Sequence, residues 1–395
     1  MNQNADPEFV SLIQNGLNVW LDTFKALDEF EWFKIDKDRA NIFQLLSFGI
    51  AHHETFDTAV SLCISIFEYI ERRGYWQEWY ALFELAYTQF DQSDQSENQY
   101  KLLNCLVQLN ILMDRIDEAE AYIKNAKCNL EVEPLTNQLT GIRCSLAQIA
   151  IRQGDLDKAQ KISEEALDAY KTLKNNSGAA HAEVLLGMVH HHQGERHQAI
   201  TYYKSAVDRW KKEKNDFWLA RTIINLGYCL IEIENYDEAD RCFEQAISIL
   251  AKSNYEFDKS TAHINRGFLY FRLEKWDKAE REFNLANSRF IRESPHTHLK
   301  SLIFHNLGSV QIKQKAHPVA EENLNFAVEL RRKLGDEVRL ASSLGTLGEL
   351  YYQLERCAES EQRLSEAIAL LELYPTNDWA LDMKSKFSEL RESLL

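Results

Sequence analysis

Alanine recurs along this chain with a period of 40 residues. It fills one matched position in successive units, and the spacing is 40 at every step except one of 41: Ala86, Ala126, Ala166, Ala206, Ala246, Ala286, Ala327 and Ala367. A repeat of this length indicates that each unit is one supersecondary structure, which buries its apolar face against the next unit. The period therefore predicts a stacked array and argues against a fold built around one central core.

Two further columns of small residues keep the same phase. A second alanine lies seven residues before the first in most units (Ala119, Ala159, Ala199, Ala239, Ala279 and Ala320), and glycine forms a third column (Gly187, Gly227, Gly267, Gly308 and Gly348). Two antiparallel helices approach closely only where their side chains are small. Each unit is therefore expected to be a helical hairpin, with the glycine in the first helix and both alanines in the second. Large residues in a matched column are expected to fill the space around the glycines: Tyr203, Phe243, Phe283 and Leu324.

Glycine and proline are scarce, with 14 and 5 residues among 395. This composition disfavours a β-sandwich or an α/β fold, because both need many glycine-rich or proline-rich turns. The expected fold class is therefore all-α, an α-solenoid of about eight hairpins with helical caps. We expect capping helices in residues 1–53, the repeat array in residues 54–375, and a C-terminal capping helix in residues 376–395.

Both predicted caps have helical patterns of their own. In the N-terminal cap, four apolar residues are spaced for one face of a helix: Ile13, Leu17, Trp20 and Phe24. In the C-terminal cap, Asn377 or Asp378 is expected to cap the last helix. Three apolar residues of that helix are expected to cover the final hairpin: Leu381, Phe387 and Leu390.

The repeat resembles the tetratricopeptide repeat. The resemblance rests on a Leu-Gly pair in the first helix, followed by an alanine, an aromatic residue and an alanine: Leu186-Gly187, Leu226-Gly227, Leu307-Gly308 and Leu347-Gly348 carry the pair. It covers about Phe56 to Tyr374, and it implies a right-handed solenoid that binds other proteins and catalyses no reaction. The period exceeds the family's usual length of about 34 residues. Long units of this kind are similar to those of bacterial peptide-pheromone receptors, of kinesin light chains, and of arrays attached to signalling ATPases.

In this family the first helix of each hairpin lines a concave surface, which positions i, i+4, i+7 and i+11 face. In three middle units this spacing gives the rows Arg221, Asn225, Tyr228 and Glu232; Thr261, Asn265, Phe268 and Arg272; and Leu302, Asn306, Ser309 and Lys313. Asparagine therefore recurs at one groove position in three successive units.

The recurring asparagines suit peptide binding, because a side-chain amide offers both a donor and an acceptor to an extended backbone. The alternative is that each asparagine hydrogen-bonds within its own hairpin or to a neighbouring one. The resemblance implies one set of candidate peptide-binding residues: Asn225, Asn265, Asn306, Arg221, Tyr228, Phe268, Arg272 and Lys313. Because the three basic members stand out in an acidic chain, we expect a ligand segment that carries carboxylates.

No catalytic motif is found. The chain has no GxxxxGK(S/T), HExxH or GxSxG motif, so we expect no enzymatic activity. His190, His191 and His192, with His197 beyond the next turn, invite a metal hypothesis. Three consecutive helical side chains point about 100° apart, however, and cannot all ligate one ion. We therefore expect neither a metal nor a cofactor, with His190 in the core and the next two histidines partly exposed.

The formal net charge of −16 disfavours nucleic-acid binding, because like charges repel. The longest mainly apolar stretch, residues 59–70, is too short to cross a bilayer, and the N-terminus has no basic region typical of a secretory signal. Seven singly scattered cysteines, without a CxxC pair, favour a reducing compartment. These features predict a cytoplasmic protein without a nucleic-acid or membrane partner.

Two functions remain open from the sequence. The first is an adaptor or regulatory subunit whose groove binds a segment of another protein. The second is a peptide-gated sensor that resembles bacterial peptide-pheromone receptors, in which a short peptide changes the curvature of the array and the N-terminal helices contact an effector. The identity of the partner and the oligomeric state are not specified by either pattern.

Overall fold

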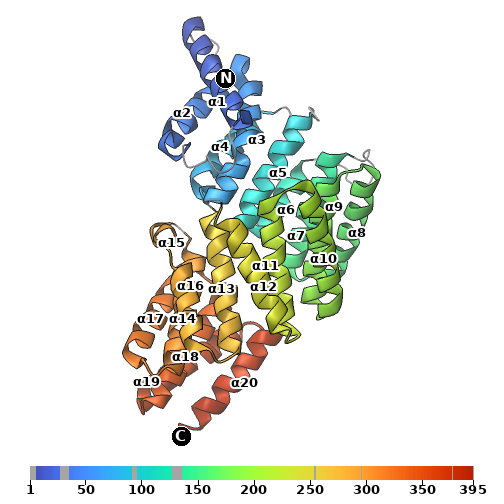
Figure 1. Ribbon diagram of the computed structural model, residues 1–395. Helices are drawn as coiled ribbons and strands as arrows, with labels where there is room; N and C mark the ends of the chain where they lie inside the picture. The colour runs from blue at the N-terminus through green and yellow to red at the C-terminus, as the bar shows by residue number, and fades with distance from the viewer. Residues whose placement is uncertain are drawn as a thin grey trace. The chain divides into compact units, whose positions relative to one another are not determined.

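The computed structural model describes residues 6–26, 35–90, 96–126, 136–252, 255–294, 296–375 and 377–394, and in these residues it contains helices and turns but no strand (Figure 1). None of the described helices is long and apolar enough to cross a membrane. Contacts divide the chain into two compact units, Met1–Tyr255 and Glu256–Leu395, which we call the N-terminal and C-terminal units. Each is described by itself.

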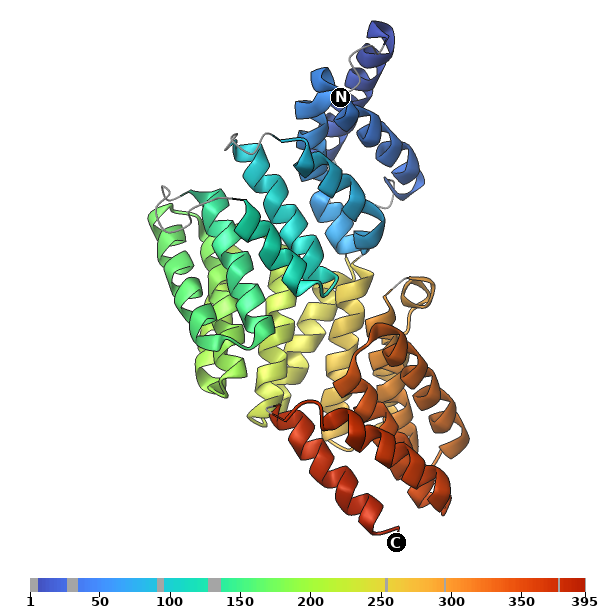
Figure 2. The ribbon, with the colours of Figure 1, turned by 180° about the vertical axis from the view of Figure 1, so that it is seen from behind.

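The N-terminal unit begins with two helices, followed by five hairpins in chain order (Figure 2). The leading helices are α1 (Pro7–Ala26) and α2 (Arg39–Ala51). The hairpins are α3 (Phe56–Arg73) with α4 (Trp76–Thr88), α5 (Glu97–Leu112) with α6 (Ile116–Asn125), α7 (Asn137–Gln153) with α8 (Leu156–Thr172), α9 (Asn176–His192) with α10 (Arg196–Glu213), and α11 (Asp216–Glu232) with α12 (Tyr236–Leu250). In α1, Ile13 and Leu17 are buried and Trp20 and Phe24 pack against the same core, so the predicted helix face is confirmed.

The C-terminal unit contains three more hairpins and a last helix. The hairpins are α13 (Glu256–Arg272) with α14 (Trp276–Ala286), α16 (Thr297–Lys313) with α17 (His317–Leu334), and α18 (Glu337–Gln353) with α19 (Cys357–Leu371). The short α15 (Arg289–Glu293) precedes α16, and α20 (Asp378–Glu392) follows the last hairpin. The described residues thus form eight hairpins, which confirms the predicted all-helical repeat fold.

The glycine column sets the distance between the two helices of a hairpin. A Cβ atom added at Gly227 would lie 2.8 Å from the ring of Phe243, and one at Gly267 would lie 2.5 Å from the ring of Phe283. Both distances are too short for an ordinary contact, so each ring occupies the volume that a larger side chain would need. The matched column of large residues is therefore confirmed as the partner of the glycine column.

Every hairpin turns in the same way. One residue in each turn has a positive φ, between 56° and 84°: Gly74, Asp114, Gly154, Gly194, Glu234, Glu274, Lys315 and Glu355. The next N–H donates to the carbonyl five residues earlier, as Lys275 does to Tyr270 at 2.9 Å. This bond is typical of a Schellman motif, which satisfies a carbonyl at the helix end. Because the turn repeats, the two helices of every hairpin keep the same register.

The first helices of successive hairpins pack more closely together than the second helices do. Helices α3, α5, α7 and α9 contact one another in succession, as do α13, α16 and α18, whereas the second helices of successive hairpins do not pack together comparably. A stack in which one layer is closer together curves toward that layer. We call the face that the predicted groove positions occupy the inner surface of each unit.

The C-terminal helix α20 packs where the first helix of a further unit would lie. The Asn377 side chain accepts a hydrogen bond from the Ala380 N–H at 3.0 Å, which confirms the predicted cap. Phe387 packs directly over Gly345. The prediction for Leu381 is wrong: its side chain is 46% exposed. Ala380, Met383 and Phe387 form the buried face instead, and Leu381 lies about 100° around the helix from Ala380.

Replacing Gly227 by alanine is expected to lower the free energy of unfolding by about 1–3 kcal/mol, because the new methyl group collides with Phe243. Gly141→Ala is the matched control. Its Cβ would lie 3.7 Å from the Tyr170 hydroxyl oxygen, an ordinary contact distance, so the change should stabilise α7 by up to about 1 kcal/mol. Urea denaturation followed by circular dichroism measures both. Equal effects of the two substitutions would contradict the packing argument.

Candidate functional site

The three predicted groove asparagines lie on the inner surfaces of the two units. Asn225 is on α11 in the N-terminal unit, while Asn265 on α13 and Asn306 on α16 belong to the C-terminal unit. All three side chains are half-buried. None of them forms a side-chain hydrogen bond with another residue in the described parts of the chain. Their amide donors and acceptors are therefore available to a ligand. The alternative, in which each asparagine hydrogen-bonds within its own hairpin or to a neighbouring one, is not observed in the described residues.

Other polar side chains on the inner surface of the N-terminal unit are paired. The Gln108 amide donates to Ser145 Oγ at 2.8 Å and to Gln148 Oε1 at 3.0 Å. Gln148 Nε2 lies 3.3 Å from the ring nitrogen of His181. These contacts link the first helices α5, α7 and α9. The unpaired asparagines thus differ from the polar groups that hold successive repeats together.

Arg221 is engaged by the chain itself. Its guanidinium lies 3.4 Å from Glu71 Oε1 and 4.9 Å from the centre of the Trp218 ring. Its side chain is only 33% exposed. Of the predicted basic ligand contacts, Arg221 is therefore the one that already has a carboxylate beside it.

The contact with Glu71 belongs to a larger junction between α3 and α11. Arg72 donates to the Tyr255 hydroxyl at 2.6 Å, and its guanidinium lies 4.2 Å from the centre of the Phe217 ring. The rings of Phe217 and Tyr255 are 5.1 Å apart. Residues separated by about 150 positions or more are thus in direct contact. The junction joins the first and fifth hairpins of the N-terminal unit.

The C-terminal unit presents basic groups without such partners. Arg272 and Lys313 are exposed, and neither forms an ion pair with any residue that the structure describes. Glu349 of α18, the first helix of the next hairpin, is paired with Lys386 of α20 at 2.5 Å. The inner surface of this unit therefore carries two available positive charges, while its nearby carboxylate is neutralised by a lysine.

The two aromatic members of the predicted set are half-buried. Phe268 lies on α13, and Tyr228 lies on α11 with its ring 5.6 Å from that of His191. Both leave part of the ring open on the inner surface, where apolar or aromatic groups can pack on it.

The histidine cluster divides between the core and the surface. His190 is 6% exposed, stacks on Tyr202, and has Nδ1 2.7 Å from Glu195 Oε2. His192 is exposed. The predicted core place of His190 is confirmed, and His191 lies half-buried between these extremes.

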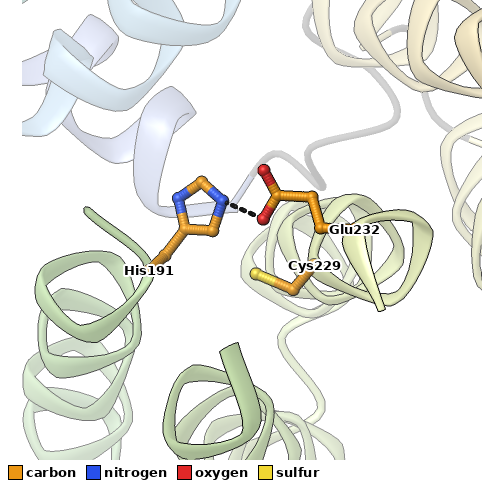
Figure 3. A group of neighbouring side chains, drawn as sticks. All are labelled: His191, Cys229 and Glu232. Atoms are coloured by element: carbon orange, nitrogen blue, oxygen red, sulfur yellow. Dashed lines mark hydrogen bonds and ion pairs between the residues drawn. The ribbon is translucent and has the colours of Figure 1, made fainter. Parts of the chain in front are cut away.

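The sequence prediction missed one group of donor atoms on the inner side of the N-terminal unit. His191, Cys229 and Glu232 place one donor atom each within 4.8 Å of one another (Figure 3). His191 Nε2 lies 2.8 Å from Glu232 Oε2, and Arg196 pairs with the same carboxylate oxygen. Burial raises the pKa of the Cys229 thiol to about 12, and Glu232 adds to that rise. A histidine nitrogen, a sulfur and a carboxylate in this arrangement can hold a metal ion.

Burial also lowers the pKa of two histidines that lie on first helices, His181 on α9 and His305 on α16. It lowers the pKa of His181 from 6.5 to about 4, and the nearby charge of Arg221 acts in the same direction. Burial, followed by the charge of Arg331, holds the pKa of His305 in the C-terminal unit well below the usual range. Both imidazoles are therefore neutral at pH 7.

Comparison with known proteins identifies the repeat. A family model described as tetratricopeptide repeat matches residues 178–252 and 299–372, and a second model with the same description matches residues 141–173. No curated protein sequence matches the chain.

Two solved structures are similar over most of the chain. A Rap protein complexed with the competence and sporulation factor has a TM-score of 0.59 and 13% identity, covering 85% of this chain and 98% of that one. The APC/C hetero-tetramer Cut9–Hcn1 also has a TM-score of 0.59 and 13% identity, covering 96% of this chain and 68% of the other. At this identity the likeness shows the fold alone.

We expect the free energy of unfolding to fall as the pH is lowered from about 6.5 toward 4, and His181→Gln to reduce that fall. The folded-state pKa of His181 is below its unfolded value, so the unfolded chain binds the proton more readily. The contribution of this residue is at most about 3 kcal/mol. Chemical denaturation at a series of pH values measures the slope. An unchanged slope in the variant would show that the His181 imidazole is accessible to protons in the folded state.

Proposed function

We propose that this chain, a tetratricopeptide repeat protein, functions as an interaction scaffold or regulatory subunit that binds a polypeptide segment on the inner surface of its repeats, in particular those of the C-terminal unit. The observation that carries the proposal is the set of three half-buried asparagines whose side chains have no hydrogen-bonding partner in the described residues. An extended peptide has one N–H and one C=O in almost every residue, and an amide side chain pairs with both.

The repeat geometry supports a binding mode with little sequence selectivity in its main-chain contacts. Asn265 and Asn306 stand at the same position of successive repeats, so they can hold successive parts of one extended segment. Side-chain preference then comes from the groups around them, in particular the half-buried ring of Phe268. The bound segment is therefore expected to present an apolar side chain beside its main-chain contacts.

Charge supports a bound segment that carries carboxylates. Arg272 and Lys313 are exposed and available on the inner surface of the C-terminal unit, and the lysine of α20 already offsets Glu349. Arg221 can take part only if a ligand carboxylate replaces Glu71 beside it. We therefore place the acidic part of the ligand on the C-terminal unit.

The cysteines support the cytoplasm as the place of action. Cys63, Cys105, Cys144, Cys229 and Cys242 are free and buried in the described structure. Buried unpaired thiols are typical of proteins that fold under reducing conditions. We assign no catalytic role to the chain, since the functional residues proposed here are suited to holding a peptide rather than to bond chemistry.

A peptide-gated sensor is the second candidate function. Its support is the similarity in fold to the Rap protein complexed with a competence and sporulation factor, which extends over 98% of that chain. A sensor changes shape when its peptide binds, whereas a scaffold with a preformed surface does not. The radius of gyration in solution with and without a bound peptide separates these two functions.

Changing Asn265 and Asn306 together to alanine is expected to weaken partner binding by about 30-fold, because two hydrogen-bonding side chains of the same unit are lost at about 1 kcal/mol each. Affinity capture from native extract, followed by titration of the purified partner, measures the loss. Asn284→Ala on the exposed face of α14 is the control and should bind normally. Equal capture by all three forms would move the binding site away from the inner surface.

The double substitution Arg272→Ala with Lys313→Ala is expected to lower affinity for the captured partner by about tenfold and to weaken its salt dependence. Arg281→Ala with Lys333→Ala removes the same net charge from exposed positions on second helices and serves as the matched control. Binding curves at several salt concentrations give both quantities. If the two double variants behaved alike, net charge rather than the inner surface would govern the interaction.

A further inference from the structure

The donor group of the N-terminal unit lies outside the peptide-binding residues proposed above, and its three atoms converge from two successive repeats. His191 stands at the end of α9, while Cys229 and Glu232 stand in the last turn of α11. Figure 3 shows the imidazole and the carboxylate facing each other, with the sulfur beside them. The His191 and Glu232 side chains are 21% and 25% exposed, and Cys229 is buried. The group is therefore shielded by protein on one side and open to solvent on the other.

Two of the three donors interrupt columns that are apolar or aromatic in most other repeats. The position of His191 is filled in six other repeats by large apolar or aromatic residues, and in the first hairpin by Glu71: the six are Ile111, Ile151, Ile231, Phe271, Ile312 and Tyr352. The position of Cys229 is filled by Tyr69 in the first hairpin and by aliphatic residues in the six others: Leu109, Ile149, Val189, Leu269, Val310 and Leu350. Each interruption alone is an ordinary substitution. Their meeting at one point, beside a carboxylate, is not explained by the packing of the repeat.

The donor types select the metal. Imidazole nitrogen, thiolate sulfur and carboxylate oxygen together suit Zn²⁺, whereas Mg²⁺ and Ca²⁺ prefer oxygen ligands alone. Tetrahedral Zn²⁺ with bonds of about 2.0–2.3 Å holds its donor atoms about 3.3–3.8 Å apart. The donor atoms here lie within 4.8 Å of one another, so side-chain movements of about 1 Å would bring them to the separations of a tetrahedral Zn²⁺ site.

Charge balance favours Zn²⁺ binding, and Arg196 is a nearby cation that competes with the ion. A thiolate and a carboxylate offset the two charges of Zn²⁺, and the imidazole binds in its neutral form. Without the ion, Arg196 pairs with Glu232. A metal ion bound to Glu232 Oε2 would have to displace Arg196 from that oxygen, and Arg196 therefore competes with the ion for this atom.

We propose that His191, Cys229 and Glu232 form a Zn²⁺ site that links the fourth and fifth hairpins of the N-terminal unit. Three protein ligands leave the fourth tetrahedral position open, and the exposed side of the group directs that position to the inner surface. Water fills it in the free protein, and a carboxylate or imidazole of a bound partner can replace the water. The thiol proton of Cys229 passes to solvent when the sulfur binds the metal.

The test uses Co²⁺ as a spectroscopic substitute for Zn²⁺ in the full-length, metal-stripped protein. We expect one equivalent of Co²⁺ to produce an absorption band from charge transfer between thiolate and metal, and Zn²⁺ to abolish it by displacement. Cys229→Ser should remove the band. Cys242→Ser, which changes another buried cysteine of the same unit, should leave it intact.

Three further variants test the site even where Cys229→Ser fails to fold. His191→Gln and Glu232→Gln should each weaken Zn²⁺ binding by at least about tenfold, since even changes to groups behind a ligand cost that much. Arg196→Gln should tighten Zn²⁺ binding, because it removes the competing cation. Zn²⁺ bound adventitiously at a surface histidine would not respond to this substitution. Absence of a saturable cobalt band in the folded wild type, or a band that survives Cys229→Ser, would overturn the site. Peptide binding that stays intact in these variants would leave the proposed function standing.

Discussion

The close approach of two helices at a glycine is the contact on which the rest of this structure depends. In five hairpins a large side chain of the second helix lies over the glycine of the first, with the missing Cβ position only 2.5–2.8 Å from that side chain. The same relation in each unit fixes the spacing of the helix pair. The repeated left-handed turn, for instance at Glu274 with its 2.9 Å bond from Lys275 to Tyr270, fixes the register. With spacing and register constant, successive hairpins stack with one layer inside, and equivalent residues fall in line.

This regularity explains why the fold could be predicted from the sequence. The alanine and glycine columns report close packing within a hairpin, and such packing depends on residues less than about one repeat apart. The turn was harder to predict from the sequence, because five of the eight residues in the left-handed conformation are Asp, Glu or Lys rather than glycine. A non-glycine residue in this conformation costs about 1–2 kcal/mol, and the carbonyl-satisfying bond and the packing of the hairpin offset that cost. The division at Tyr255 lies between two repeats of the same phase. The sequence there is not rich in proline, glycine or serine, so it could not be recognised as a linker.

Long-range contacts account for what the sequence could not predict about the candidate site. Arg221 fits the groove spacing, but its pairing with Glu71 depends on how α3 and α11 meet across five hairpins. Periodicity predicts the helix face on which a residue lies, but it does not predict which distant side chain contacts that residue. The donor group of His191, Cys229 and Glu232 was missed for a related reason. The three adjacent histidines lie on one helix, whereas the converging atoms come from the equivalent ends of two helices, α9 and α11.

The inner surface therefore divides into polar groups that hold repeats together and polar groups that are left available. The most direct measurement of the central claim is site-specific photocrosslinking in native extract. The crosslinking residue stands either at Gln353, the exposed last residue of the first helix α18, or at Asn284 on the exposed face of the second helix α14. The account predicts that a polypeptide partner is trapped from Gln353 and not from Asn284. A partner trapped only from Asn284 would contradict it and place binding on the outer surface.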